Sequence, residues 1–386
     1  MARRVLFCVG EKSGDQHAAN LVRELRGSDG EIIVDALGGA ELRAAGAIIH
    51  HDSVSNAAVG IKALLRWREV LAMEKWMRGY LETSRPDLVI CVDSWGMNKR
   101  FARLAHDRGV KVMYFISPQV WASREGRVKQ MRRWVDRVAC ILPFEEEYLT
   151  SRGVAATYVG HPLFDHVKAA PRRAAAERYP NRPAVVAIVA GSRRGVASAN
   201  FPRLLDVAVG MKSRVAGLTF RIPTTEATDP VVRSVLAKRR LGAGDGFVVD
   251  LDGFDRVMPE VDICLTVSGT ATLHAAAFGV PMIAVYYVNP WEWHLIGRWI
   301  VKARTFVMVN ILIGGKEKVV PEFIPWYGPV EPVTRAAMEM LKDVPRQEAI
   351  SAKLAGLMAR VGRGGASKRA AAVAMELMGV AEKREG

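Results

Sequence analysis

The chain lacks a hydrophobic run long enough to cross a bilayer. Among its 386 residues, Pro281–Val288 is one of the longest apolar stretches, and it has the length of a strand. The first residues, Met1–Arg4, are basic and precede a short apolar segment, as in an export signal. That segment ends at once at Glu11 and Lys12, where a signal peptide needs a longer core and a cleavage site. We therefore expect a cytoplasmic protein.

Cysteine is scarce, and the four cysteines show no paired spacing. They are Cys8, Cys91, Cys140 and Cys264. Each lies inside an apolar stretch that has the composition of a strand. Metal or redox motifs place cysteines close together in sequence. We therefore interpret all four as small buried hydrophobic residues.

Acidic residues are fewer than basic ones. The chain has 40 Asp and Glu against 55 Lys and Arg, a formal net charge of +15. This excess fits an anionic partner, such as a nucleic acid, a phosphorylated substrate or an acidic membrane surface, and it equally fits an ordinary basic surface. Because no recognised nucleic-acid motif accompanies the charge, we rank a nucleic-acid partner last and expect none.

Short apolar runs alternate with longer amphipathic stretches along the whole chain. In the first half the runs are Val5–Val9, Leu88–Val92, Lys111–Ile116 and Ala139–Leu142, with helical stretches such as His17–Arg26 and Asn98–Arg108 between them. In the second half they are Ala184–Ala190, Thr219–Pro223, Phe247–Leu251, Asp262–Val267 and Met282–Val288. This alternation is typical of parallel sheets that are covered by helices on both faces.

A charged segment with three prolines, residues 168–183, separates the two series and predicts a linker. We expect an α/β protein of two doubly wound, Rossmann-like domains, 1–167 and 184–350, that face a cleft, followed by a basic helical tail, 351–386. Ligands of such sheets bind beyond the carboxyl ends of the strands. The residues that carry chemistry should therefore lie just after each strand.

Three loops after predicted strands carry polar groups in the first half. Gly10–His17 predicts a tight turn into a helix whose free amides can hold an anion, although Asp15 in it can equally cap the helix. Asp93 follows the strand Leu88–Val92, where it suits either a general base or a helix cap. Phe115–Arg124 offers stacking and charged groups.

Two turns in the second half indicate a nucleotide site. They are Gly191-Ser192-Arg193 and Ser268-Gly269-Thr270. Arginine in the first turn can pair with phosphate oxygens in two-pronged geometry. The second turn ends a strand and opens a helix, so it offers hydroxyls and amides to a second phosphate. Each turn alone fits a plain helix cap, but together they favour a diphosphate.

The ordered set of motifs resembles that of the lipid-A-disaccharide synthase family. The motifs are Gly-Glu-Lys-Ser-Gly-Asp, Ser-Pro-Gln-Val-Trp-Ala, Leu-Pro-Phe-Glu, Val-Gly-His-Pro-Leu, Gly-Ser-Arg, Ser-Gly-Thr-Ala-Thr-Leu and Val-Val-Pro-Glu-Phe. The combination is specific, although no single motif is. The resemblance implies a GT-B fold with an acceptor-binding N-terminal domain and a UDP-sugar-binding C-terminal domain. It also implies inverting transfer of 2,3-diacylglucosamine from UDP to the 6-hydroxyl of 2,3-diacylglucosamine 1-phosphate, which forms a β(1→6) disaccharide in lipid A biosynthesis.

The resemblance favours the role of Asp93 as the base that deprotonates the acceptor hydroxyl over its role as a helix cap. The residues that we assign to substrate or nucleotide binding are Glu11, Ser13, Gly14, Asp15, Ser117, Gln119, Trp121, Gly191, Ser192, Arg193, Ser268, Gly269, Thr270, His274 and Asn310. Arg193 and the turn at Ser268–Thr270 can stabilise the leaving diphosphate, and we expect no metal or other cofactor. Asp250 and Asp252 have the spacing of a metal-binding pair, but we favour a surface role for them.

Acylated substrates imply contact with a membrane. Ala57–Met77 interleaves apolar and aromatic residues with basic ones, as does a helix that lies in an anionic interface. The membrane contacts that we select in it are Ile61, Leu64, Leu65 and Trp67. A core-facing helix explains the pattern equally well. We expect peripheral binding to the cytoplasmic face of the inner membrane, and a homo-oligomer is a further option.

Three positions depart from the family's pattern at the presumed site. Gly96 stands where the family tends to have Asp, and Val196 and His274 stand where it usually has Glu. Such changes also fit a divergent GT-B relative, for example a UDP-N-acetylglucosamine 2-epimerase, or a catalytically silent membrane-associated binding protein. Retained Asp93 and Arg193 argue against the silent protein, and an epimerase would not need the amphipathic stretch.

Overall fold

The structure, a computed structural model, divides into two compact units. It describes residues 2–54, 62–121, 126–167, 172, 177–289, 291, 305–314 and 318–380, with only the backbone for 62–67. Unit 1 comprises Met1–His166 and Arg363–Gly386, and unit 2 comprises Val167–Gly362. Among the described residues, no helix is long and apolar enough to cross a membrane.

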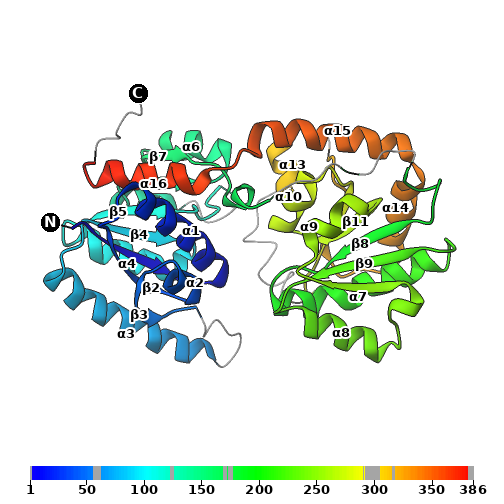
Figure 1. The fold of residues 1–386 in the computed structure, drawn as a ribbon, viewed down its shortest axis with the longest axis horizontal. Helices are drawn as coiled ribbons and strands as arrows, with labels where there is room; N and C mark the ends of the chain where they lie inside the picture. Colours follow the sequence, from blue (N-terminus) through cyan, green and yellow to red (C-terminus); the bar gives the residue numbers. More distant parts are fainter. Residues whose placement is uncertain are drawn as a thin grey trace. The chain divides into compact units, whose positions relative to one another are not determined.

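Unit 1 is a seven-stranded parallel sheet with helices on both faces (Figure 1). Its strands are β1 (Arg4–Val9), β2 (Ile33–Gly38), β3 (Ile48–Asp52), β4 (Leu88–Val92), β5 (Lys111–Phe115), β6 (Arg137–Cys140) and β7 (Ala156–Tyr158). Its helices are α1 (Lys12–Ser28), α2 (Ala40–Ala44), α3 (Lys62–Thr83), α4 (Trp95–His106), α5 (Arg127–Trp134), α6 (Pro143–Thr150), the 3₁₀ helix η1 (Pro162–Asp165) and α16 (Ala366–Leu377). The sheet order is β3-β2-β1-β4-β5-β6-β7, so the direction of winding reverses between β1 and β4.

The core of unit 1 follows from the two-residue period of its strands. In β1, Leu6 and Cys8 join a cluster formed with α3, α4 and α5, which includes Met77. Their neighbours Val5 and Phe7 join a second cluster on the opposite face, formed with α1 and α16. Because both faces are covered, β1 and β4 have near-continuous apolar sequences instead of an apolar–polar alternation.

The C-terminal residues are divided between the units, whereas we expected a separate tail at 351–386. The helix α16 packs against α1 in unit 1, where Ala370 is fully buried, since small side chains let the two helices approach closely. Asp165 fixes the start of α16, because its carboxylate accepts the amides of Ala366 at 2.8 Å and Ser367 at 2.9 Å. Unit 1 is therefore completed by residues from the far end of the chain.

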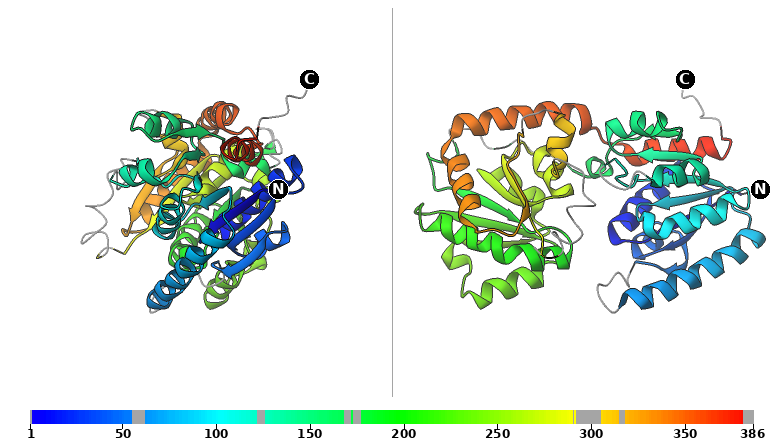
Figure 2. Two further views of the ribbon diagram at one scale, coloured as in Figure 1. Left: turned by 90° about the vertical axis from the view of Figure 1, so that its left-hand side faces the viewer. Right: turned by 180° about the vertical axis from the view of Figure 1, so that it is seen from behind.

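Unit 2 is a six-stranded parallel sheet, also with helices on both faces (Figure 2). Its strands are β8 (Val185–Val189), β9 (Thr219–Thr224), β10 (Phe247–Leu251), β11 (Ile263–Val267), β12 (Met282–Tyr287) and β13 (Glu322–Trp326). Its helices are α7 (Arg194–Lys212), α8 (Asp229–Lys238), α9 (Phe254–Val257), α10 (Thr270–Ala277), α13 (Met308–Ile313), α14 (Glu331–Lys342) and α15 (Val344–Val361), with the 3₁₀ turns η3 (Ala243–Asp245) and η4 (Met258–Glu260). The order β10-β9-β8-β11-β12-β13 places the reversal between β8 and β11.

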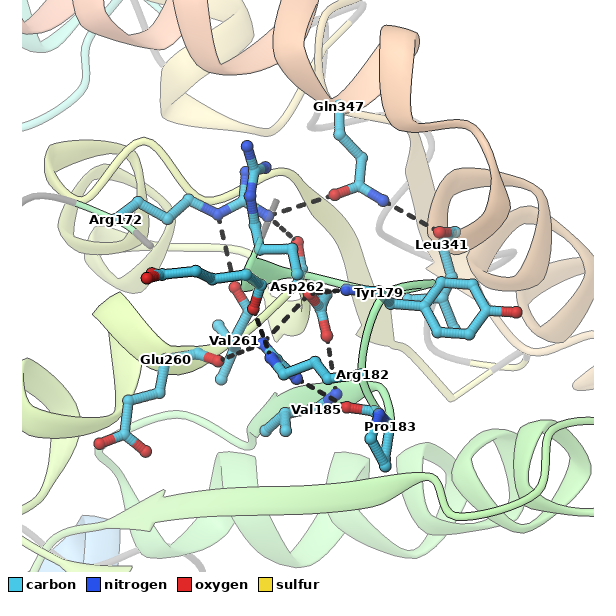
Figure 3. Close-up of polar contacts among 12 residues, drawn as sticks. Arg172, Tyr179, Arg182, Pro183, Val185, Glu260, Val261, Asp262, Leu341 and Gln347 are labelled. Atoms are coloured by element: carbon cyan, nitrogen blue, oxygen red, sulfur yellow. Dashed lines mark hydrogen bonds and ion pairs between the residues drawn. The ribbon is translucent and has the colours of Figure 1, made fainter. Parts of the chain in front are cut away.

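The described part of the expected linker, 168–183, is bound to unit 2 (Figure 3). Asp262, which is fully buried, accepts the amide of Tyr179 at 3.1 Å and the guanidinium of Arg182 at 3.3 Å. Arg172 donates to the Asp262 carbonyl, and burial lowers its pKa to about 10. A buried charge is stable only when such partners surround it, so this network holds the segment against the sheet.

The predicted strands of both halves are confirmed to within one or two residues at each end. The four cysteines lie in β1, β4, β6 and β11 and are buried and free, as predicted. Four strands were not predicted from the sequence, namely β2, β3, β7 and β13. β3 and β7 lie at the edges of the sheet in unit 1 and β13 at an edge in unit 2, where burial and therefore the apolar signal are weakest.

Candidate active site

The carboxyl ends of β1, β4 and β5 lie side by side in unit 1. The parallel register pairs Val9 with Val92 and Val92 with Phe115, so the loops that follow these strands share one edge of the sheet. A side chain added at Gly10 would come within 2.8 Å of the end of Met97 and 3.1 Å of Ser94, so glycine allows this close approach. The turn after β1 is thus packed directly against the turn that carries Asp93.

Asp93 and Ser94 form a strained turn between β4 and α4. Their φ angles are 49° and 45°, a left-handed conformation that costs a residue with a side chain about 1–2 kcal/mol. Two buried partners fix the turn: the side chain of Asn98 donates to the Asp93 carbonyl at 2.9 Å, and the Tyr114 hydroxyl donates to the same oxygen. Strain of this kind is concentrated at functional sites, where the fold holds a side chain in one direction.

The alternative role of Asp93 was to cap the helix that follows β4. The strained turn places another residue, Ser94, between Asp93 and that helix. α4 begins at Trp95, and its N-cap residue is Ser94. Tyr114 lies close enough to Asp93 to feel its charge, since burial first, followed by the charges of Cys91 and Asp93, raises the pKa of the Tyr114 hydroxyl well above its usual range. The aspartate therefore lies at the strand end, next to a buried neutral phenol.

Asp15, in the Gly-Glu-Lys-Ser-Gly-Asp turn, is buried with 1% exposure. Its two carboxylate oxygens accept the amides of Gly39 at 2.8 Å and Glu41 at 2.9 Å, which begin α2. Burial raises the pKa of Asp15, and these amides partly offset that effect. Asp15 thus joins α1 to the loop after β2, and Glu11 and Ser13 are the more accessible side chains of the motif.

The loop after β5 contains Ser117, which is buried, Gln119, which is exposed, and Trp121, which is partly exposed. The Trp121 indole donates to the buried carboxyl of Glu145 at 3.2 Å and lies edge-on to Phe144, with ring centroids 5.1 Å apart. Burial raises the pKa of Glu145 to about 7. Trp121 is therefore held in place by the first turn of α6, the helix that follows the neighbouring strand β6.

In unit 2 the two predicted turns also lie on adjacent strands. β8 and β11 pair through Val189 and Thr266, and a side chain added at Gly191 would come within 3.0 Å of Val267. Gly191 has a φ of 96° and Gly269 a φ of 139°, so a glycine supplies the positive φ angle in both turns. The side chains of Ser192, Arg193 and Thr270 are exposed around them.

The side chain of the N-cap residue does not cap either of the helices that follow these turns. The N-cap residues of α7 and α10, Arg193 and Gly269, make no side-chain cap hydrogen bond to the helix. The first amides of a helix carry partial positive charge and bind anions when no side chain caps them. The two turns at β8 and β11 therefore offer two neighbouring anion-receptive ends.

A polar network joins Ser268 to Asn310. Ser268 donates to the Phe306 carbonyl at 2.7 Å, and the Phe306 amide donates to the carboxylate of Glu322 at 3.0 Å. Asn310 donates to the same carboxylate at 2.6 Å and exchanges two hydrogen bonds with the backbone of Val320. Asn310 is buried, so its described contacts are those of a brace for the loops beside α10.

His274 lies one turn into α10 and is part of a side-chain pair. Its Nε2 lies 2.6 Å from a carboxylate oxygen of Asp255, and its ring stacks on Phe254 with centroids 3.9 Å apart. Burial lowers the pKa of His274, while Asp255 opposes the shift. Where the family usually has Glu, this chain therefore has a histidine that is paired with the carboxylate of Asp255.

Sequence reasoning missed the two buried glutamates, Glu145 and Glu322. The signal for Glu145 was present, because Leu-Pro-Phe-Glu has proline and glutamate at the places that open a helix. Glu322 lies in the Val-Val-Pro-Glu-Phe motif, but no local pattern reveals that it gathers partners from Thr305 to Lys318. Both residues position loops at the strand ends.

The described residues contain no group of three or more His, Cys, Asp or Glu side chains that could hold a metal ion. Asp250 is paired with Arg221 at 2.6 Å and lies 3.4 Å from Arg256, and the hydrogen bond from Arg221 is the largest cause of its lowered pKa. Its carboxylate is thus engaged by arginines, and Asp250 is buried with 7% exposure, so the surface role that we favoured is wrong for Asp250, whereas Asp252 is exposed.

All four selected membrane contacts remain predictions. Ile61 lies outside the described residues, and the side chains of Leu64, Leu65 and Trp67 are not described. Further along α3, Val70, Met73 and Met77 belong to the core of unit 1, as the core-facing interpretation of that part requires. An exception is Leu71, which is 42% exposed. In unit 2, Trp291 is 76% exposed.

Solved structures with the same architecture define the class of fold. The MnaA–UDP structure from S. aureus has a TM-score of 0.64 at 14% sequence identity and covers 100% of this chain and 99% of its own. MurG from Acinetobacter baumannii has a TM-score of 0.57 at 13% identity and covers 97% and 99%. The protein therefore has a GT-B-like α/β fold.

Sequence comparisons give the family within that class. Residues 5–375 match the family described as Lipid-A-disaccharide synthetase. The lipid-A-disaccharide synthases of Geobacter metallireducens and Geobacter sulfurreducens are each 36% identical to the chain and cover 98% of both sequences. The chain belongs to the lipid-A-disaccharide synthase family, and it is a glycosyltransferase of lipid A biosynthesis.

Proposed function

We propose that the protein transfers 2,3-diacylglucosamine from UDP to the 6-hydroxyl of 2,3-diacylglucosamine 1-phosphate with inversion at the anomeric carbon. The observation that carries this proposal is the match to lipid-A-disaccharide synthases over nearly the whole of both sequences. The solved UDP-N-acetylglucosamine 2-epimerases share the fold at 12–14% identity, which supports no more than the fold.

Asp93 is the proposed base. Its carboxylate takes the proton of the acceptor 6-hydroxyl while the oxygen attacks the anomeric carbon of the donor from the side opposite UDP. The bond between that carbon and the diphosphate oxygen breaks, and UDP leaves with the electron pair. The fixed turn at Asp93 and Ser94 supports this role, because a base is effective only within hydrogen-bond reach of its proton.

Unit 2 is the proposed site for the UDP part of the donor. Arg193 and the exposed turn at Gly269 and Thr270 can stabilise the charge that develops on the leaving diphosphate. Neither turn requires a metal to supply positive charge. We further propose that unit 1 binds the acceptor and that Leu64, Leu65 and Trp67 contact the membrane surface that contains both lipids.

The test is a transfer assay with purified protein in detergent, with UDP-diacylglucosamine, diacylglucosamine 1-phosphate and a chelator. Mass spectrometry is expected to detect a tetraacyl disaccharide 1-phosphate together with UDP. Absence of the disaccharide, with UDP still bound in calorimetry, would contradict the proposed acceptor. Absence of both would favour the silent binding protein.

A further inference from the structure

Trp121 belongs to the loop after β5, at the edge of the sheet that carries Asp93. β5 lies beside β4 in unit 1 (Figure 1), and the Asp93 amide donates to the Phe115 carbonyl at 3.0 Å. The loop that begins at Ile116 therefore starts directly alongside the proposed base. Because the carboxyl ends of parallel strands share one edge of a sheet, a ligand at Asp93 lies on the same side of unit 1 as this loop.

The described part of this loop is fixed at three points. Ile116 has a φ of 65°, a left-handed conformation that a β-branched residue adopts only when its surroundings enforce it. Val120 is 2% exposed and belongs to the core cluster that contains Trp95. The third point is Trp121, whose indole N–H is held by Glu145. The loop therefore presents its tryptophan in one orientation.

The group that holds Trp121 is a buried carboxyl. Glu145 is 1% exposed, and it accepts the Trp121 indole at 3.2 Å and the amides of Ile141 at 3.2 Å and Leu142 at 3.1 Å. Burying a carboxyl group is costly, and burial is the largest cause that raises its pKa to about 7. Because a glutamate can complete a capping box from the surface of a helix, capping alone does not require this burial. A requirement for a fixed Trp121 explains it.

The surface that Trp121 leaves for a ligand is aromatic. The residue is partly exposed, although its one polar group is used by Glu145. Phe144 packs against it in a T-shaped arrangement, with ring centroids 5.1 Å apart. The face of an aromatic ring is negatively polarised and attracts C–H groups. A sugar ring has most of its hydroxyls around its rim and C–H groups on its faces, so it complements such a surface.

We propose that the sugar ring of the acceptor packs on the exposed aromatic face of Trp121, and that Glu145 is the positioning residue that fixes this face. The inference rests on the proposed function, since it places the glucosamine ring of that acceptor beside the proposed base. The acceptor is favoured over the donor because Trp121 and Asp93 belong to one unit, while the UDP part of the donor is proposed to bind in unit 2. An aromatic face orients the ring without engaging any one hydroxyl, so the 6-hydroxyl stays free to approach Asp93.

Two replacements of Trp121 isolate the contribution of the aromatic face. Trp121→Phe and Trp121→Leu both remove the N–H that Glu145 accepts, and both leave an apolar side chain, but only phenylalanine keeps an aromatic ring. In the transfer assay, KM for diacylglucosamine 1-phosphate should rise about tenfold or more in Trp121→Leu and about threefold in Trp121→Phe. The change in kcat should be smaller than the change in KM, and KM for the UDP-sugar donor should change less than about twofold.

A double-mutant cycle tests whether Glu145 acts through Trp121. Glutamine has one acceptor oxygen, which should stay with the two backbone amides and leave the indole without a partner. At pH 8, where Glu145 is ionised, Glu145→Gln should raise KM for the acceptor about threefold. In the Trp121→Phe background, which lacks the indole N–H, the same change should add less than about 1.5-fold. Glu147→Gln is the matched control, because Glu147 is an exposed carboxylate of the same helix.

An equal effect of Glu145→Gln in both backgrounds would mean a merely structural role and would overturn its assignment as a positioning residue. An unchanged acceptor KM in Trp121→Leu, equal losses in Trp121→Leu and Trp121→Phe, or a rise confined to the donor KM would each overturn the sugar-binding face. In all of these cases the disaccharide still forms, so the proposed function stands.

A parallel calorimetric titration uses glucosamine 1-phosphate and UDP as soluble probes. Trp121→Leu should weaken binding of glucosamine 1-phosphate more than Trp121→Phe does, with UDP binding unchanged. That result supports the site even if the transfer assay shows no disaccharide, in which case the proposed function fails and the site stands. Equal binding of glucosamine 1-phosphate by the unchanged protein and both variants would overturn the site.

Discussion

The two units contain the same kind of parallel sheet, but they turn the chain differently where the winding reverses. After β4 and β5 of unit 1, Asp93, Ser94 and Ile116 take positive φ angles although all three have side chains. After β8 and β11 of unit 2, glycines take the positive φ angles, at Gly191 and Gly269. At these strand ends unit 1 therefore accepts backbone strain and unit 2 avoids it, although Asp252, directly after β10 of unit 2, also has a positive φ of 49°.

This difference determines which chemical groups each strand end presents to a ligand. A strained turn with side chains can aim a carboxylate, and buried partners must then compensate the strain. A glycine turn presents bare amides and lets an anion approach the backbone closely. A proton acceptor in unit 1 and a diphosphate site in unit 2 make use of these two properties.

The largest expected effect is the loss of turnover when the turn at Asp93 and Ser94 in unit 1 is changed. Because Asp93 is the proposed base, Asp93→Asn should lower turnover at least about a hundredfold. UDP binding, measured by calorimetry, should be unchanged because the nucleotide is proposed to bind in unit 2. Near-normal turnover would remove Asp93 from its role and with it the functional reason for the strain.

The buried carboxyl of Glu145 makes the stability of unit 1 depend on pH. Its folded-state pKa of about 7 exceeds its usual value of 4.5, so the folded protein holds this proton more tightly. The contribution of Glu145 to the free energy of unfolding is greatest below pH 4.5 and falls as pH rises to 7, by about 3 kcal/mol in all. Urea unfolding should show that the free energy of unfolding of Glu145→Gln rises relative to that of the unchanged protein as the pH is raised from 5 to 8.

Asp250 of unit 2 serves as the control for that prediction. Arg221 lowers the pKa of Asp250, so the stability that this carboxylate contributes is lost only as pH falls through acid values. Asp250→Asn should therefore differ from the unchanged protein by a constant amount between pH 5 and pH 8. A slope in this variant, or none in Glu145→Gln, would contradict the assignment of the pH dependence to Glu145.

The glycine turn of unit 2 should not tolerate a side chain. Gly191→Ala would place a methyl group 3.0 Å from Val267 at a φ of 96°, and we expect a loss of about 1–3 kcal/mol in the free energy of unfolding. Gly195→Ala is the control, because a side chain there meets open space at the start of α7. Chemical denaturation of both variants tests this, and equal stabilities would mean that glycine is not required at the turn.

A smaller effect, on UDP affinity, is expected when the planar guanidinium of Arg193 in unit 2 is replaced by an ammonium group. Arg193→Lys keeps the charge but loses two-pronged pairing with phosphate, so UDP should bind about tenfold more weakly in calorimetry. Arg194→Lys, at the neighbouring exposed arginine, should change the affinity less than about twofold. If both variants bind UDP equally well, Arg193 does not contact the diphosphate.

The smallest effect concerns a surface that only unit 1 is proposed to have. Replacement of Leu64, Leu65 and Trp67 by Ser should weaken liposome binding severalfold, since each removes apolar area from the interface. Val209→Ser, at an apolar residue of unit 2 that is 44% exposed, is the control. Binding of a soluble UDP-sugar should be intact in both variants, and unchanged liposome binding would return this part of α3 to the core.

The strands that flank the site could be predicted because they are buried on both faces and therefore continuously apolar. β4 was predicted with its observed bounds, Leu88–Val92, and the position of Asp93 at its end followed. The helix after it was placed too late, at Asn98 instead of Trp95, because no local pattern signals a left-handed Ser94 as its N-cap residue. The edge strand β3, with exposed Ile48 and polar His50, gave no strand signal at all.

The sequence by itself determined the α/β class, the two series of strands and the family, since burial and turn chemistry leave local patterns and ordered motifs. Only the tertiary structure decided that Asp15 braces α2, that Asn310 and Ser268 share a network through Glu322, and that α16 completes unit 1. These contacts join residues far apart in the chain, and no short-range pattern records which distant backbone or side chain will satisfy a buried polar group.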